Sequence, residues 1–226
     1  MREPAAFVLV HGAWCGGFIW RGVADRLRTA GHRVFTPTLT GLADRSHLLS
    51  PEIDLATHIA DVVNLVHWES LHGFVLVGHS YGGMVINGVA EALPEGTIRS
   101  IVFLDACVPL DGESTASIEK PFAEAFDCDP VPFLFTGQTG NPDFEALTTP
   151  HPSRTLHDRA RVTGKVEAIA RKHYILATSP AMPFFVETVA RLRGEPGWQV
   201  NELPCSHGTM PDMPDETTRL LLNAAV

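Results

Sequence analysis

Short runs of apolar residues, many of them β-branched or aromatic, alternate along the chain with longer segments of helical periodicity. The apolar runs are strand candidates at residues 6–10, 33–38, 74–77, 100–104, 173–178 and 199–203. The helix candidates cover about residues 18–30, 54–69, 82–93, 181–193 and 214–225. Near-continuous apolar strands separated by helices are typical of a parallel sheet that is covered on both faces. We therefore expect an α/β fold with a mostly parallel sheet of about six strands.

One long stretch, at about residues 109–171, interrupts this alternation. It is rich in Pro, Phe, Thr and Asp, has no strong strand signal, and lies between two strand candidates. Connections of this length in compact domains are commonly lids over functional sites, although an irregular connection is the simpler interpretation. We expect one domain over residues 1–226, with a small helical cap inserted at about 109–171.

Composition and charge exclude several functional classes. The 226 residues are 45% hydrophobic, and 26 acidic against 17 basic residues give a net charge of −9. This balance is not typical of intrinsic disorder, and it provides no attraction to nucleic acid or to anionic membranes. The four cysteines form neither a CxxC pair nor a zinc-ligand spacing, and the first residues resemble neither a secretory signal nor a membrane helix. We expect a cytoplasmic protein without nucleic-acid or membrane partners and without a metal or other cofactor.

A serine between two glycines is the strongest chemical signal. The sequence Gly78-His79-Ser80-Tyr81-Gly82 directly follows one strand candidate and directly precedes a helix candidate. Glycines two residues before and after a serine relieve the crowding of a sharp strand-to-helix turn. Such a turn holds the hydroxyl at a helix N-terminus, where the dipole favours developing negative charge. The pattern predicts that Ser80 is a nucleophile; a turn serine that only caps the helix is the alternative.

A second motif, His11-Gly12-Ala13-Trp14, follows the first strand candidate. Acyl transfer requires two hydrogen-bond donors at the position where the carbonyl oxygen becomes negative. In this architecture one donor is the N–H of the residue after the nucleophile, Tyr81, and the other lies in the loop after an earlier strand. We assign Ala13 as that second donor and expect His11 to order the loop rather than to transfer protons.

A third motif, PCSHG at residues 204–208, places a histidine between the last strand candidate and the C-terminal helix. In chains that carry serine, acid and histidine in this order, the general base belongs to that loop. The ordinary pKa of histidine, near 6.5, suits His207 to accept a proton from Ser80 and to donate it to the leaving group.

At these three motifs the sequence resembles the α/β-hydrolase superfamily, and within it the branch of plant methylesterases, salicylate-binding esterases and hydroxynitrile lyases with their bacterial relatives. The segments VLVHGAWCGGFIW, TLTGLADRSHLLSPEIDLATHIADVV, FVLVGHSYGGMVI, IVFLDACVPLDG and LPCSHGTMPDMPDE carry the resemblance. It covers nearly the whole chain and is weakest through residues 109–171. The resemblance implies an α/β-hydrolase fold, Ser80 as nucleophile, His207 as base, and Ala13 and Tyr81 as oxyanion donors.

The sequence departs from that family at the acid of the triad. Relatives usually carry the acid in the loop after the penultimate strand, but residues 178–183 read TSPAMP and contain no carboxylate. A carboxylate is needed to hold the imidazole in the right tautomer and to stabilise its cation. Asp105 ends the preceding strand candidate on the same sheet edge as Ser80, so we assign it as the acid. Alternatives are a structural role in the cap-entry loop and a dyad without an acid.

Two glycines favour hydrolysis over cyanohydrin cleavage. Lyases of this branch carry Thr where Gly12 stands and Lys where Gly208 stands, and the lysine charge would stabilise departing cyanide. Neither residue is present here. We therefore expect an esterase that works through an acyl-enzyme. A non-hydrolytic lyase or cyclase of the same fold, and a small-molecule receptor with little turnover, remain alternatives.

The substrate site is expected to be apolar. Gly12 leaves room for substrate and water. The candidate lining residues are aromatic side chains near the motifs and in the cap, namely Trp14, Phe18, Phe122, Phe126, Phe133 and Phe135. Ligand pockets are mostly apolar with few polar groups, so a small apolar or aromatic ester or lactone fits. For the cap residues, ordinary core packing is the alternative. A homodimer is compatible with the sequence.

Overall fold

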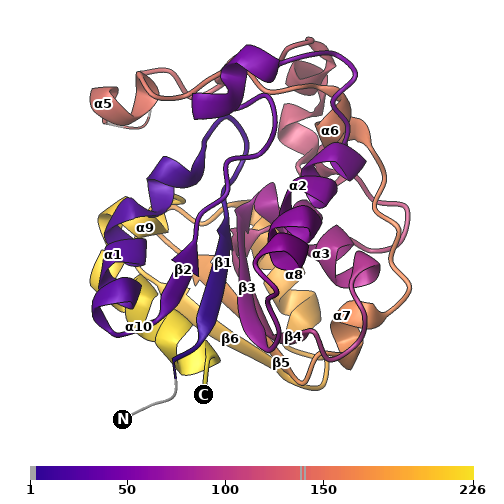
Figure 1. Ribbon diagram of the computed structural model, residues 1–226. Coiled ribbons are helices and arrows are strands. Elements are labelled where there is room, and N and C mark those ends of the chain that lie inside the picture. The colour runs from indigo at the N-terminus through magenta and orange to yellow at the C-terminus, as the bar shows by residue number, and fades with distance from the viewer. Residues whose placement is uncertain (1–3, 138, 140) are drawn as a thin grey trace.

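Six parallel strands form the single sheet of the computed structural model, which describes residues 4–137, 139 and 141–226 (Figure 1). Their order across the sheet is β2-β1-β3-β4-β5-β6, and every pairing is parallel. The strands are β1 (Ala6–Val10), β2 (Arg33–Phe35), β3 (Phe74–Ser80), β4 (Ile98–Ala106), β5 (Arg171–Ala177) and β6 (Trp198–Leu203). The expected α/β fold with six strands is confirmed.

Helices cover both faces of the sheet, and each face has its own hydrophobic core. On one face lie η1 (Gly17–Trp20), α1 (Arg21–Thr29), α9 (Thr209–Asp212) and α10 (Pro214–Ala224). On the other lie α2 (Leu55–Trp68), α3 (Gly82–Ala92) and α8 (Pro183–Leu192). Successive strand residues point to opposite faces of the sheet. Leu76 therefore packs in the core beneath α2, α3 and α8, while its neighbours Val75 and Val77 pack in the core beneath α1 and α10. All five longer helices lie where the periodicity predicts them.

Three strand ends differ from the prediction, and those of β3 and β4 matter for the site. β2 stops at Phe35, two residues before Pro37, because proline has no N–H for the ladder. β3 continues through Ser80 and β4 through Ala106, and these two residues are register partners. Ser80 and Asp105 therefore lie on adjacent strands at the carboxyl edge of the sheet.

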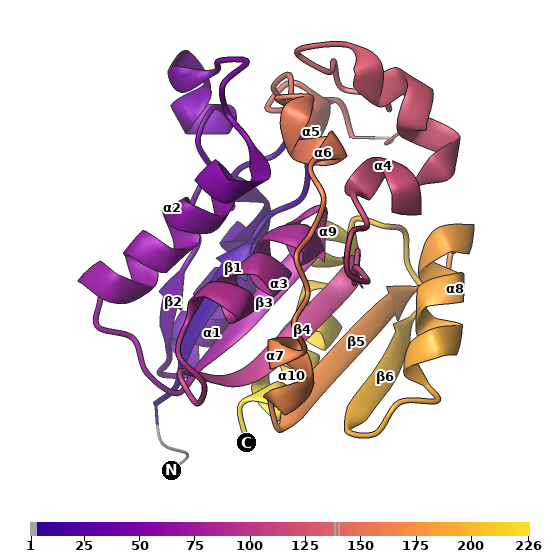
Figure 2. The ribbon, with the colours of Figure 1, turned by 90° about the vertical axis from the view of Figure 1, so that its right-hand side faces the viewer.

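The stretch between β4 and β5 consists of short helical turns. α4 (Thr115–Ile118), η3 (Lys120–Asp127), α5 (Pro142–Glu145) and α6 (Arg154–His157) lie above the carboxyl edge of the sheet, as Figure 2 shows. An isolated bridge between Val131 and His151 ties this cap together. The remainder descends beside the sheet to α7 (Lys165–Ala168), where Lys165 Nζ donates to two carbonyls at the end of α3. Only the first part of the stretch is thus a cap.

The region between β2 and α2 contains one more short helix, η2 (Ala43–Leu48). α2 begins after Asp54, whose carboxylate accepts the Thr57 N–H in a capping box. Within the described residues, no helix is long and apolar enough to cross a bilayer.

Candidate active site

The turn at Ser80 is as sharp as its two glycines predict. Ser80 ends β3 with a φ of 54°, in the left-handed region, and α3 begins two residues later. A Cβ on Gly78 would lie 2.6 Å from the Gly82 carbonyl oxygen, and one on Gly82 would lie 2.7 Å from that of His11. Only glycine fits at either position. The turn presents Ser80 at the N-terminus of α3.

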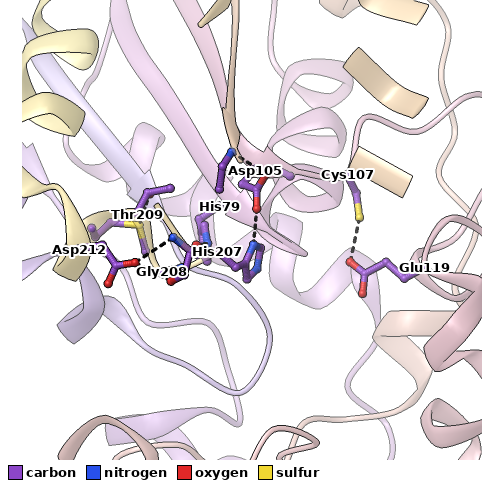
Figure 3. Close-up of polar contacts among 12 residues, drawn as sticks. His79, Asp105, Cys107, Glu119, His207, Gly208, Thr209 and Asp212 are labelled. Atoms are coloured by element: carbon purple, nitrogen blue, oxygen red, sulfur yellow. Dashed lines mark hydrogen bonds and ion pairs between the residues drawn. The ribbon is translucent and has the colours of Figure 1, made fainter. Parts of the chain in front are cut away.

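His207 and Asp105 form a close pair, although 102 residues separate them in the chain. His207 Nδ1 lies 2.6 Å from Asp105 Oδ2, and the other carboxylate oxygen accepts the Ala177 N–H at 3.1 Å (Figure 3). Asp105 is 1% exposed, whereas the His207 side chain is 28% exposed. Because the carboxylate accepts at Nδ1, it holds the proton there and leaves Nε2 free to accept another. This is the arrangement that a general base and its orienting carboxylate require.

The histidine beside Ser80 holds the His207 loop in place. His79 Nε2 donates to the His207 carbonyl oxygen at 2.9 Å, and the two imidazole rings lie 4.5 Å apart. Burial, and secondarily the charge of His207, keep the pKa of His79 well below its ordinary value, so His79 is neutral. Within the described residues the Ser80 hydroxyl takes part in no hydrogen bond of its own. His79, the residue before Ser80, thus ties the His207 loop to the sheet edge where β3 ends, and no hydrogen bond joins the Ser80 hydroxyl to His207 in the described residues.

Two backbone donors near Ser80 have no acceptor in the described part of the chain. Ala13 and Tyr81 are 8% and 1% exposed, and neither N–H is hydrogen-bonded there. The neighbouring Trp14 N–H, by contrast, donates to His151 Nδ1. Buried backbone N–H groups are rarely left without a partner, so these two are available to an oxygen of a bound molecule.

His11 orders the loop after β1 as expected. Its Nδ1 donates to the Gly12 carbonyl oxygen at 2.8 Å, and its Nε2 accepts the Leu39 N–H at 3.0 Å. Burial lowers the pKa of His11 to about 4, so the ring is neutral. A Cβ on Gly12 would lie 2.9 Å from Ser80 Cβ and 3.1 Å from His79 Nδ1. The glycine lets this loop pass directly against Ser80.

Trp14 joins the same loop to the cap. It adopts a φ of 62°, its indole N–H donates to the Val131 carbonyl oxygen, and its carbonyl oxygen accepts the Thr149 N–H. Three of the five non-glycine residues with positive φ in the described chain are Trp14, Ser80 and Asp105. Backbone strain of this kind persists where the surrounding structure enforces it, and it clusters at functional sites.

The Tyr81 side chain is enclosed by histidines. Its hydroxyl lies 2.9 Å from His58 Nδ1, and His58 Nε2 donates to the Thr40 carbonyl oxygen. The Tyr81 ring packs 5.0 Å from that of His151, whose Nε2 donates to Thr155 Oγ1 at 2.8 Å. Burial lowers the pKa of both histidines. Neutral imidazoles therefore hold Tyr81, one candidate oxyanion donor, and Trp14, the residue that follows the other.

The predicted aromatic lining residues gather around Trp14. Its ring lies about 6 Å from the rings of Phe126, Phe133 and Phe135. Phe122 contacts Phe135 and Phe126, and Phe18 joins the group only through Phe144. Phe126 and Trp14 are buried, whereas Phe18, Phe122, Phe133 and Phe135 are half-buried. Which of these side chains contact substrate stays a prediction.

Several residues at the site carry no recognisable sequence signal. Phe185 stacks on the His207 ring at 5.7 Å, and Phe184 connects it to Phe122. His151 and Glu119 lie in the cap, where no periodicity marks them. The helical pattern of residues 181–193 places Phe185 in a helix but indicates no role at the site. In the described part of the chain, His, Cys, Asp and Glu side chains form no cluster that could hold a metal ion.

Several known proteins are similar to this chain in sequence. The model of the alpha/beta hydrolase family matches residues 7–220. The carbendazim hydrolyzing esterase of Nocardioides sp. (strain SG-4G) is 39% identical over 238 residues, which cover 96% of this chain and 98% of that protein. Salicylic acid-binding protein 2 of Nicotiana tabacum is 35% identical over 127 residues, which cover 55% of this chain and 48% of its own length.

A similar fold is known experimentally. The structure of an extracellular alpha/beta-hydrolase from a Paenibacillus species superposes with a TM-score of 0.84 at 27% identity, covering 98% of this chain and 99% of that chain. That protein is described as sharing structural and functional homology with the tobacco salicylic acid binding protein 2.

Proposed function

The chain belongs to the alpha/beta hydrolase family, and from this premise we propose that it is a serine esterase with a Ser80–His207–Asp105 triad. The esterase names of its relatives support ester hydrolysis. The observation that carries the triad is the 2.6 Å contact between His207 Nδ1 and Asp105 Oδ2 on the sheet edge where Ser80 ends β3.

In the proposed reaction, Ser80 Oγ attacks the ester carbonyl while His207 Nε2 takes the hydroxyl proton. Asp105 keeps the other imidazole proton on Nδ1 and stabilises the cation that forms. The N–H groups of Ala13 and Tyr81 donate to the oxyanion. His207 then protonates the departing alcohol, and water attacks the acyl-enzyme by the same steps. Hydrogen bonds between nucleophile and base often shorten only when substrate binds.

The substrate proposed is a small apolar or aromatic ester or lactone. The aromatic side chains around Trp14 and the stack of Phe185 on His207 support this choice. Gly12 and Gly208 disfavour the lyase alternative, because neither can supply the hydroxyl or the positive charge that cyanide release requires. A receptor with the same pocket would bind such an ester without turning it over. The expected homodimer and the cytoplasmic location stay predictions; the similar Paenibacillus protein is described as extracellular.

A fluorophosphonate probe, combined with hydrolysis of p-nitrophenyl esters, tests the proposal. We expect stoichiometric labelling of Ser80 and turnover, with both lost in Ser80→Ala. Ser70→Ala is the matched control, because Ser70 also adopts a positive φ, 51°, but is exposed and lies away from the site. Labelling without turnover would favour the receptor, and folded protein without labelling would refute the serine esterase.

A further inference from the structure

Glu119 is a buried carboxyl group that the proposed mechanism does not use. It lies in the cap at the junction of α4 and η3 and is only 8% exposed. Its backbone is fully engaged, since the N–H donates to the Thr115 carbonyl oxygen and its own carbonyl oxygen accepts the Phe122 N–H. The backbone therefore fixes where the side chain starts.

The carboxyl group itself has very little hydrogen bonding. In the described chain its one partner is the thiol of Cys107, with 3.4 Å between Sγ and Oε1, and no basic side chain forms an ion pair with it. A thiol is a weak donor, whereas a buried carboxylate ordinarily accepts several strong hydrogen bonds. Burial raises the pKa of Glu119 to about 7, against the opposing effect of His207. The Glu119 carboxyl group can therefore accept further hydrogen bonds, which the described part of the protein does not provide.

The unfilled carboxyl faces the catalytic side of the cap. Figure 3 shows its oxygens on the His207 side of the residue, and the two groups influence each other electrostatically. The Phe122 N–H donates to the Glu119 carbonyl oxygen, and the Phe122 ring begins a row of aromatic contacts: it contacts Phe184, which contacts Phe185, which stacks on His207. Glu119 is thus a polar group next to an aromatic row that leads to the proposed general base.

We propose that Glu119 is a specificity-determining residue that accepts a hydrogen bond from an N–H group next to the ester group of the substrate. It therefore favours N-monosubstituted carbamate esters over esters of the same shape that lack the N–H. Because the Glu119 carboxyl oxygens face the side on which His207 lies, we place the substrate atoms adjacent to the ester within their reach. This inference rests on the proposed esterase function.

Three matched substrates test it. Methyl N-phenylcarbamate and methyl phenylacetate differ only by N–H against CH₂, and methyl N-methyl-N-phenylcarbamate keeps the carbamate but removes the donor. In Glu119→Gln we expect kcat/KM for the N–H carbamate to fall about 10- to 100-fold, the range for loss of a hydrogen bond to a charged group. The two substrates without the donor should change less than about 3-fold.

Two further variants complete the design. Glu119→Leu removes the acceptor altogether and should show the same selectivity change, while Glu124→Gln, an exposed residue of the same helix η3, should change none of the three substrates. Protection of Ser80 from the fluorophosphonate probe by each compound measures binding where turnover is slow.

The outcomes separate this inference from the function on which it rests. An equal fall for all three substrates would mean that Glu119 acts through His207, and an unchanged ratio would mean that it contacts no donor; either overturns the inference while the esterase stands. If the probe never labels Ser80 in the wild type, the proposed function itself fails.

Discussion

The backbone N–H of Trp14 donates to Nδ1 of His151, across 137 residues of sequence and between the first loop and the cap. The distance is 3.2 Å, and the ring is fixed from its other side by Thr155 Oγ1. Ala13, the candidate oxyanion donor, directly precedes Trp14, so this hydrogen bond from the cap helps to hold the loop that carries it. The cap therefore anchors the loop that carries a candidate oxyanion donor.

His151→Ala should consequently weaken catalysis without contacting substrate. Losing the imidazole leaves the Trp14 N–H without an acceptor, and an unsatisfied buried donor costs about 1–3 kcal/mol. We expect kcat for a p-nitrophenyl ester to fall roughly 10-fold or more, with KM changing less, because a misdirected oxyanion donor weakens the transition state selectively. His157→Asn, at an exposed position of the nearby helix α6, is the control. A change confined to KM would contradict the positioning role.

Asp105→Asn should preserve the fold and nearly abolish turnover. The asparagine carbonyl can still accept the Ala177 N–H, but its amide would donate to His207 Nδ1 and move the imidazole proton to Nε2. The base could then no longer accept from Ser80, so we expect kcat to fall by about 10⁴-fold, measured with a p-nitrophenyl ester. Asp215→Asn, an exposed partner of Arg26, should remain fully active. Activity within a few-fold of wild type would make Asp105 structural.

The strained turn predicts different stabilities for two variants that both lose the Ser80 hydroxyl. Ser80 has a φ of 54°, which glycine adopts freely and alanine does not. Ser80→Gly should be more stable than Ser80→Ala by about 1 kcal/mol, although both lose the nucleophile. Urea denaturation of the two proteins measures the difference, and equal midpoints would show that the turn stores no strain.

A methyl group at Gly12 should disable the site. Its Cβ would lie 2.9 Å from Ser80 Cβ, so the loop or the nucleophile must shift, at a cost of about 1–3 kcal/mol in the free energy of unfolding. Gly12→Ala should therefore lower both stability and kcat. In Gly22→Ala the new Cβ has no neighbour closer than 3.5 Å, and replacing a glycine within helix α1 should maintain or raise stability. Thermal unfolding and ester turnover of the Gly12→Ala and Gly22→Ala proteins test both expectations.

Stability should decrease as the pH falls from 7 to 5. Burial keeps the pKa values of His11, His58, His79 and His151 below 6.5, so below that pH the unfolded chain binds protons that the folded protein does not. Each such histidine removes about 1.4 kcal/mol per pH unit, for His11 down to pH about 4.

Glu119 acts in the opposite direction, because its raised pKa lets the folded state bind a proton first. Glu119→Gln should therefore lose stability more steeply between pH 7 and 5 than the wild type does. Denaturant titrations at pH 7, 6 and 5 measure both slopes, and a flat wild-type profile would mean that these imidazoles become protonated in the folded state.

Local patterns predicted the parts of this protein that depend on neighbours in the chain. The apolar runs identified all six strands, and the glycines around Ser80 identified a turn whose crowding the structure confirms at Gly78 and Gly82. These inferences succeed because strand alternation, helix periodicity and the steric freedom of glycine act over a few residues. Asp105 and His207 could be proposed as partners only because parallel strands end at one edge.

The cap was predictable only in outline. Its helices are mostly four residues long and begin at prolines or at capping residues such as Ser114, so they contain too few turns for an apolar period to appear. Consequently nothing in the sequence indicated that His151 would meet Trp14 or that Phe185 would stack on His207.

The sequence by itself thus determined the sheet, the nucleophile turn and the identity of the candidate base, because those features arise from short-range geometry. The tertiary structure alone decided that Asp105 reaches His207, that the cap directs the loop carrying Ala13, and that the Glu119 carboxyl is buried with one weak donor. These contacts join residues from 12 to 137 positions apart, and their hydrogen bonding and burial exist only once the strands and the cap have packed.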